Sequence, residues 1–242
     1  MFKKIMLFAL AIQLTSCSTA QLGGILDQVS KIPAATNGEP SSQEVGSGLK
    51  EALNLGIGKG VDFLSAKDGY YKSAYKILLP ADAQKVVTKL RNIPGFDKVE
   101  EIAIEKMNHA AEDAAVKAKP IFIKAIREMS FADAWNILTG GKGAATSYLK
   151  EKTYQTLYSE FNPVVVESLN KFGAVDYWAQ AANTYNKLPF VSGKANPRID
   201  DYVTSKALDG LFSMVTEKEN DIRQNPVART TDLLKKVFSR AK

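Results

Sequence analysis

Apolar residues recur at intervals of three and four over most of this chain. The first clear example is Leu49, Leu53, Ile57, Val61 and Leu64, which this spacing places on one face of a helix. No stretch longer than four or five residues alternates with the period of two that a half-buried strand requires. The pattern predicts an all-α fold, a single multi-helix, bundle-like domain of about eight or nine helices.

Proline and capping residues set the boundaries of the predicted helices. Pro80 opens a helix that ends before Pro94, and the long helix that follows is expected to kink or restart at Pro120. Ser130 is a predicted N-cap, and Pro163 is expected to begin a helix of its own. The predicted helices cover residues 44–65, 80–93, 96–129, 131–138, 144–161, 163–173, 175–188, 203–222 and 226–238.

The N-terminus carries a different pattern. Two lysines precede an apolar run from Ile5 to Leu14, which only Gln13 interrupts, and small residues follow it. At about 1.5 Å per residue a ten-residue helix covers roughly 15 Å, half of the hydrocarbon core of a bilayer. Residues 1–16 are therefore predicted to be a secretory signal peptide rather than a transmembrane helix.

The signal peptide ends at the only cysteine of the chain. Leu14-Thr15-Ser16-Cys17 resembles the bacterial lipobox, and this resemblance implies a diacylglyceryl thioether on Cys17, cleavage before it and acylation of the new amino group, for example with palmitate. Three acyl chains exceed the two signals that stable membrane attachment needs. The alternative is a conventional signal peptide with a chance cysteine at its end.

A predicted tether follows the lipidation site. Residues 17–43 are rich in Ser, Gly, Thr and Ala, and about 25 flexible residues would reach roughly 25–30 Å. Residues 44–242 form the predicted helical domain. Ser18 favours transfer to the outer membrane, because in proteobacterial lipoproteins an aspartate at this position usually prevents it. The expected location is a periplasm-facing position in the bacterial cell envelope, lipid-anchored to the outer membrane.

Charge and cysteine content exclude several classes of function. The net charge of +6 falls to +4 without the signal peptide, and basic and acidic residues are interspersed, which does not indicate a nucleic-acid-binding surface. Weak attraction to anionic lipids is the more natural consequence. With Cys17 lipidated, no thiol remains for a disulfide, a catalytic nucleophile or a metal site.

One helix face carries candidate metal ligands. Glu101, Glu105, Asn108 and Glu112 recur at helical spacing with His109 at their edge, as in carboxylate-rich metal sites of helical bundles. A di-metal site needs a second histidine on another helix, and His109 is the only histidine. A solvated polar face is the favoured interpretation, and neither a metal nor a cofactor is expected.

Three other features each allow two interpretations. Gly56, Gly58 and Gly60 could cradle a phosphate or allow a neighbouring helix to approach, and the absence of a known phosphate-binding pattern favours the second. The Gly140–Gly143 loop with Lys142 could bind an anion at a helix N-terminus or be a plain turn, which we favour. The third feature is a group of aromatic residues, which could line a pocket or belong to the core, and we favour the core. These residues are Tyr177, Trp178 and Tyr185.

Several motifs follow one another in a characteristic order. They are Met107-Asn108-His109-Ala110-Ala111-Glu112, Ala132-Asp133-Ala134, Ala144-Ala145-Thr146, Ala207-Leu208-Asp209-Gly210-Leu211-Phe212 and the stretch from Ile222 through Arg229-Thr230-Thr231-Asp232 to Leu234. Together they resemble the bacterial family of proteins of unknown function numbered 4197, over residues 48–238. The resemblance implies a helical envelope protein, often with a lipoprotein signal, and no established activity or catalytic residues.

The polar residues of these motifs form the candidate site. They are expected to converge between the long helix and the C-terminal pair of helices. There they form either a site for a ligand or partner or buried pairs that fix the helix register. We favour the buried pairs, because buried charges normally have partners. The candidates are Asn108, Glu112, Glu219, Arg223, Arg229, Thr230 and Asp232.

These features predict a membrane-anchored periplasmic lipoprotein with a binding or scaffolding role rather than a catalytic one. Its expected partners are the membrane, through the N-terminal lipid, and an envelope protein or lipid-like ligand, but no nucleic acid. One alternative is a carrier or sensor of a hydrophobic or anionic envelope ligand. A second is a carboxylate-based hydrolase or metal enzyme.

Overall fold

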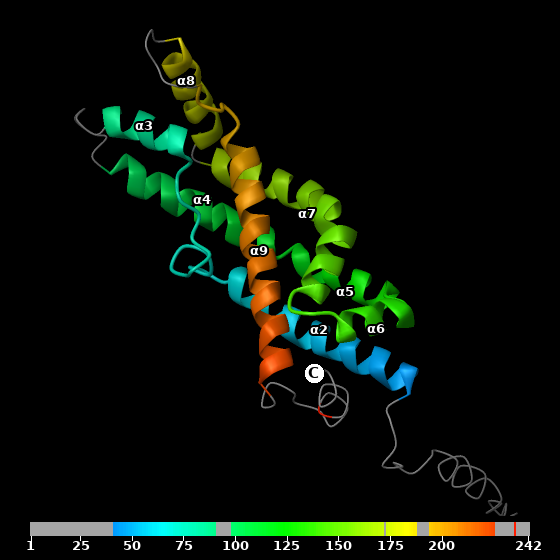
Figure 1. Ribbon diagram of the computed structural model, residues 1–242. Helices are drawn as coiled ribbons and strands as arrows, with labels where there is room; N and C mark the ends of the chain where they lie inside the picture. Colours follow the sequence, from blue (N-terminus) through cyan, green and yellow to red (C-terminus); the bar gives the residue numbers. More distant parts are fainter. Residues whose placement is uncertain (1–40, 91–97, 172, 188–193, 226–234, 236–242) are drawn as a thin grey trace, which may run out of the picture. The chain divides into compact units, whose positions relative to one another are not determined.

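Helices make up all the regular secondary structure in the described part of the chain. The computed structural model describes residues 41–90, 98–171, 173–187, 194–225 and 235 (Figure 1). The helices are α2 (Ser42–Leu64), α3 (Ala81–Leu90), α4 (Val99–Ala115), α5 (Ala118–Glu128), α6 (Phe131–Thr139), α7 (Ala144–Asn170), α8 (Ala174–Asn186) and α9 (Ile199–Gln224). They confirm the all-α prediction. None of these helices is long and apolar enough to cross a membrane.

Helix α2 begins two residues earlier than its apolar spacing indicates. Ser41 is the N-cap, its hydroxyl accepts a hydrogen bond from the Glu44 amide at 3.2 Å, and the Glu44 carboxylate accepts one from the Ser41 amide at 2.7 Å. This capping box satisfies two amides that a helix N-terminus otherwise leaves free. The polar cap, and not the first buried residue, therefore sets the boundary between the predicted tether and the folded domain.

Helix α7 corrects the prediction of a break at Pro163. Pro163 lies inside a helix that runs from Ala144 to Asn170, and its own side chain is exposed. Leu157, Phe161 and Val165 are fully buried at intervals of four, so the buried stripe continues past the proline. Its burial outweighs the one backbone hydrogen bond that proline removes. The two helices predicted over residues 144–161 and 163–173 are therefore a single helix.

The predicted restart at Pro120 and the predicted cap at Ser130 are found. Helix α4 ends at Ala115 and α5 begins at Ala118, so that Pro120 lies in the first turn of α5, where its missing amide costs nothing. The Ser130 hydroxyl accepts from the Asp133 amide at 3.1 Å and caps α6. The predicted last helix, after Pro226, lies outside the described residues.

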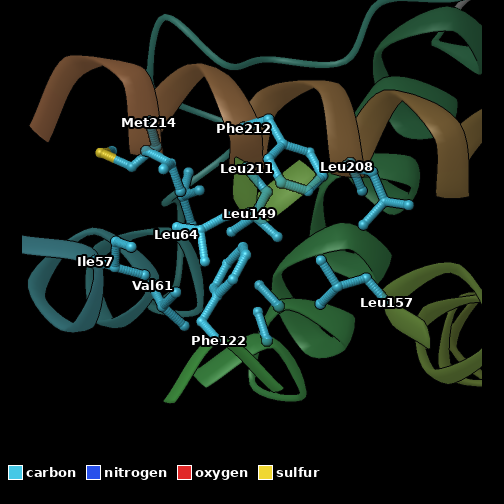
Figure 2. Packing of buried hydrophobic residues seen from close by; sticks show 14 of the residues in the cluster. Ile57, Val61, Leu64, Phe122, Leu149, Leu157, Leu208, Leu211, Phe212 and Met214 are labelled. Atoms are coloured by element: carbon cyan, nitrogen blue, oxygen red, sulfur yellow. The ribbon is translucent and has the colours of Figure 1, made fainter. Parts of the chain in front are cut away.

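The core forms where α2, α4, α5, α7 and α9 pack together. Helix α7 packs against α4 and α9, and α2 packs against α5, α6 and α9. Four alanines on one face of α4 are completely buried, which lets neighbouring helices approach closely: Ala110, Ala111, Ala114 and Ala115. Figure 2 shows side chains of this core from four helices, namely Val61 and Leu64 of α2, Phe122 of α5, Leu149 and Leu157 of α7, and Leu208, Leu211 and Phe212 of α9.

A smaller apolar cluster lies where α3 meets α8. Val86, Ala182 and Ala195 are buried there, and Trp178 packs against them while its indole Nε1 donates to the Asn196 carbonyl at 2.9 Å. Trp178 therefore packs in a small core, as predicted, although it is only partly buried. The side chains of Tyr177 and Tyr185 lie outside the described residues.

Candidate functional site

Residues 65–80 connect α2 to α3 through a tight turn at Asp68-Gly69. Asp68 has a φ of +68°, and the Gly69 amide donates to the Ala66 carbonyl at 2.9 Å. A Cβ atom on Gly69 would lie 2.3 Å from the Phe63 carbonyl oxygen. Only glycine fits this position, so the turn fixes the direction in which the connecting segment leaves α2.

Asn108 and Glu112 of α4 hold this connecting segment in place. The Asn108 amide group is completely buried; its Oδ1 accepts from the Ile77 amide at 2.7 Å and its Nδ2 donates to the Ile77 carbonyl at 2.8 Å. Glu112 Oε1 accepts from the amides of Tyr70 and Tyr71, both at 3.0 Å. Both side chains therefore replace backbone partners for a segment that is not helical.

The other oxygen of Glu112 contacts the only histidine. His109 Nδ1 lies 2.6 Å from Glu112 Oε2, and His109 Nε2 lies 3.6 Å from Glu105 Oε1. The predicted polar face is thus partly an interaction surface within the protein. No group of three or more His, Cys, Asp or Glu side chains among the described residues is placed to hold a metal ion.

Glu219 and Arg223 of α9 join α9 to the junction between α6 and α7. Glu219 Oε1 accepts from the Ala145 amide at 3.1 Å, and Oε2 accepts from the Thr146 amide at 3.0 Å and the Thr146 hydroxyl at 2.9 Å. Arg223 Nε donates to Glu219 Oε1 at 2.9 Å, and its Nη2 donates to the Ile137 carbonyl at 2.6 Å. One ion pair therefore satisfies the N-terminus of α7 and the C-terminus of α6.

The contacts of Glu219 also distinguish between the two interpretations of the glycine loop before α7, an anion-binding site or a plain turn. The first amides of α7 favour a negative charge, and the protein's own carboxylate supplies it. Gly143 has a φ of +82° and Lys142 is exposed. The loop is therefore a turn between two helices, as the favoured interpretation predicts. The N-terminal anion site of α7 is filled by Glu219, which the sequence did not indicate.

The seven candidate residues divide into two described pairs and a remainder. Asn108 and Glu112 bind residues 70–77, whereas Glu219 and Arg223 bind the α6–α7 junction. In the described part of the chain the two pairs thus contact different segments. The remaining candidates, Arg229, Thr230 and Asp232, lie outside the described residues.

An open groove lies between α2, the connecting segment and α9. It has a volume of about 660 Å³ and is lined by the second half of α2, residues 72–75 of the connecting segment and the second half of α9. Its lining includes the side chains of Leu55, Phe63, Tyr75, Met214 and Ile222. None of the four described candidates lines it, but Asn108 and Glu112 hold the connecting segment that forms one wall, and Glu219 and Arg223 hold α9, which forms another.

The glycines of α2 explain why this helix can lie so close to α9. A Cβ on Gly56 would lie 3.0 Å from Ile222 Cδ1, and one on Gly60 would lie 2.8 Å from Met214 Cγ. Both glycines lie within α2, where backbone amides are used in the helix ladder. The structure therefore supports close helix approach rather than a phosphate cradle for Gly56 and Gly60.

The groove combines apolar and charged side chains. Leu55 and Phe63 are 43% and 49% exposed, which is unusual for large apolar residues. Lys218 pairs with Glu217 and Asp221, at 3.1 and 3.8 Å. Other polar contacts in the groove are an ion pair of Lys72 with Asp68 at 2.9 Å and a hydrogen bond from the Tyr75 hydroxyl to Glu217 at 2.6 Å. Lys59 lines the groove and has no ion pair with another described residue.

These groove residues are not among those predicted from the sequence. Leu55 and Phe63 are apolar residues of α2 that lie off its buried stripe, which is the one signal in the sequence that could have indicated them. Tyr75 and Lys72 come from a segment whose path depends on α4, and no local pattern places them opposite α9.

Comparison with known proteins gives a family but no activity. The family model described as "Protein of unknown function (DUF4197)" matches residues 39–239. The chain belongs to this family. No curated protein and no solved structure matches the chain.

The DUF4197 match begins just before α2, the first helix among the described residues. Its first residue, 39, lies two positions before Ser41, the N-cap of α2, and it includes both described pairs of polar candidates. The resemblance inferred from motifs over residues 48–238 is therefore confirmed, with a start nine residues earlier. The family match thus includes every residue that lines the groove.

Proposed function

We propose that this DUF4197 protein is a lipid-anchored, periplasm-facing lipoprotein of the bacterial outer membrane with a non-catalytic binding or scaffolding role. The groove between α2 and α9 is its binding surface, and an envelope protein is its partner. The lipobox-like sequence before Cys17 supports the anchor. The observation that carries the binding role is the groove itself, because its two walls are held by buried polar residues that do not enter it.

The arrangement fits a partner with an apolar segment and an acidic group. Exposed apolar side chains of Leu55 and Phe63 offer area for hydrophobic contact, and Lys59 offers a cation. Grooves between two helices accept helical segments through apolar anchors spaced along one face. The same chemistry supports a second candidate, a carrier of an amphiphilic anion, because about 660 Å³ lies in the usual range of small-molecule sites.

The anchor is tested by the mass of the mature N-terminus in a Gram-negative host. The expected chain begins at Cys17, carries three acyl chains, takes up labelled palmitate and sediments with the outer membrane. Cys17→Ala should abolish labelling, and Ser18→Asp should move the chain to the inner membrane. A mature chain without acyl groups would contradict the anchor.

The groove is tested by photo-crosslinking in intact cells. A photoreactive amino acid is placed at Leu55 in the groove and, as a matched control, at Val116, which is 60% exposed and does not line it. A discrete protein adduct is expected from position 55 only, and Lys59→Glu should weaken it. Equal adducts from both positions would contradict the groove as the binding surface.

The carrier candidate is tested by native mass spectrometry of the chain purified without detergent. A bound mass that disappears on denaturation, and that Phe63→Asp removes, would favour the carrier over the scaffold. A clean mass of the protein alone favours the scaffold.

A further inference from the structure

Helix α6 presents two large aromatic side chains to solvent. Phe131 is 55% exposed and Trp135 is 52% exposed, and they lie one turn apart on the same face. The opposite face is buried through Ala134, Ile137 and Leu138. A half-exposed tryptophan beside a half-exposed phenylalanine is uncommon on a water-facing surface and marks a contact region.

The exposed face of α6 carries no charge. Its other exposed residues are Ala132, Asn136 and Thr139. Asp133 is the one charged residue of α6, and its carboxylate is used for the cap, where it accepts from the Ser130 amide at 2.9 Å and the Ser130 hydroxyl at 2.6 Å. Exposed cations stand just beyond both ends, Arg127 before the helix, next to the exposed Glu128, and Lys142 after it. Aromatic residues flanked by basic ones are typical of a surface that meets lipid head groups.

The position of this face indicates which surface it meets. Phe131 packs against the backbone of α2 at Gly46, where an added Cβ would lie 2.6 Å from the Phe131 ring. Gly46 is five residues from Ser41, the N-cap at which the predicted tether joins the domain. Phe131, one turn from Trp135, therefore lies at the end of α2 from which the chain continues towards Cys17.

The predicted length of that tether would keep the face close to a bilayer. The residues between Cys17 and Ser41 would have a root-mean-square span of about 25–30 Å if they are as flexible as their composition predicts. A tether of this length holds the domain at a high effective concentration near the membrane, so a weak aromatic contact is enough to be populated.

We propose that Phe131 and Trp135 insert into the head-group region of the same membrane that holds the lipid on Cys17. The contact rests on the proposed lipid anchor but is separate from the groove. The groove positions of α2, from Ala52 to Phe63, lie about 9 to 26 Å farther along the helix than Gly46. Insertion at α6 thus leaves the groove accessible to a periplasmic partner.

The chain offers a direct probe, since it has two tryptophans and one cysteine. In the Trp178→Phe variant Trp135 is the only fluorophore of its kind. The chain from Cys17 to Lys242 is coupled through the Cys17 thiol to a maleimide lipid in vesicles of phosphatidylethanolamine and phosphatidylglycerol. This coupling replaces the biological lipid, so the measurement does not depend on lipidation in cells, which the mass of the mature chain reports separately.

We expect the emission of Trp135 to shift to shorter wavelength when the chain is coupled to vesicles. Lipids brominated in the acyl chain should quench Trp135 at least twofold more than they quench Trp178, which is measured in the Trp135→Phe variant. Ala132→Asp, which places a charge between the aromatics, should remove this excess quenching. The matched change Gln155→Asp on the exposed face of α7 should not.

Two results would overturn the proposal. One is quenching of Trp135 no greater than that of Trp178. The other is a Trp135 emission that is already shifted without vesicles, depends on protein concentration and resists brominated lipid, because the face would then be covered by a second copy of the chain.

Discussion

Glu219 and Asn108 use nearly all of their hydrogen-bonding capacity inside the protein. Each is at most 4% exposed and each joins segments far apart in sequence. Burying such groups costs free energy unless every polar atom finds a partner, and here the partners are backbone groups of segments that lack their own. At the scale of the residue, these side chains therefore determine where neighbouring segments lie.

Glu219→Ala tests the join between α9 and α7. The substitution leaves the Arg223 guanidinium and two amides of α7 without their carboxylate, so we expect the free energy of unfolding to fall by about 3–5 kcal/mol. Urea unfolding followed by circular dichroism measures the change. Asp209→Ala removes an exposed pair with Lys206 on the same helix and should cost less than about 1 kcal/mol. Similar losses for the two variants would contradict the assigned role.

Asn108→Ala tests the join between α4 and the connecting segment. It removes both partners of the buried Ile77 peptide groups, and the expected loss is about 2–4 kcal/mol. Hydrogen exchange of the Ile77 amide should accelerate in the variant, and it should not in Asn54→Ala, an exposed change on α2. An unchanged exchange rate at Ile77 would show that the segment is held by other contacts.

At the scale of the element, the same residue type has different effects along one helix. Gly56 and Gly60 face α9, where a side chain would meet Ile222 or Met214, whereas Gly58 meets only the end of Lys119 at 3.8 Å. Glycine costs a helix about 1 kcal/mol relative to alanine, and this cost is offset only where the space is needed. The glycine-rich stretch therefore combines two positions of close approach with one that has room.

Gly58→Ala and Gly60→Ala should therefore change the free energy of unfolding in opposite directions or by different amounts. Gly58→Ala is expected to raise the free energy of unfolding by about 0.5–1 kcal/mol through helix propensity alone. Gly60→Ala requires Met214 to move and should lie at least about 1 kcal/mol below Gly58→Ala. Thermal unfolding of the two variants in parallel measures the difference. Equal gains would mean that α2 and α9 are not held closely at Gly60.

At the scale of the whole molecule, one buried and one half-buried tyrosine link the connecting segment to α9. The Tyr70 hydroxyl is completely buried and donates to the Ala207 carbonyl at 2.8 Å, and Tyr202 donates to the Leu78 carbonyl at 2.9 Å. Burial raises the pKa of both phenols, and the charge of Glu112 adds to the effect at Tyr70. A hydrogen bond to Asp201, together with burial, raises the pKa of Tyr158 to about 12.

These shifts predict the behaviour of the fold at alkaline pH. A folded pKa above the ordinary value of 10 means that the fold favours the neutral phenol, so this stabilisation is complete below pH 10 and is lost as the pH rises through the folded pKa. Absorbance at 295 nm should show some tyrosines ionising near pH 10 and the others together with loss of helical signal. Tyr70→Phe should weaken the pH dependence of stability above pH 10. Ionisation of all tyrosines in one step near pH 10, with the helices intact, would contradict the burial of Tyr70.

The helical class, most helix boundaries and the family can be inferred from the amino-acid pattern alone. Apolar spacing of three and four, prolines and capping residues act within a few residues, so they are legible in a linear pattern. That is why Ser130 and the restart near Pro120 were found where predicted. The polar motif residues could likewise be selected from the sequence, but their partners could not: Asn108 holds the connecting segment, and Glu219 holds the start of α7.

The contacts of these residues, in contrast, depend on how distant segments pack in the fold. Pro163 is tolerated because Phe161 and Val165 are buried on either side of it, a fact that depends on α4 and α9 and not on the local sequence. The groove exists because Asn108, from α4, fixes a segment that precedes it by some thirty residues, while Glu219 fixes α9. Contacts between distant segments cost chain entropy and are made only where packing and hydrogen bonds offset it. The residue pattern within a single helix does not show whether packing and hydrogen bonds between distant segments offset this loss of entropy. The groove is therefore visible only in the three-dimensional structure.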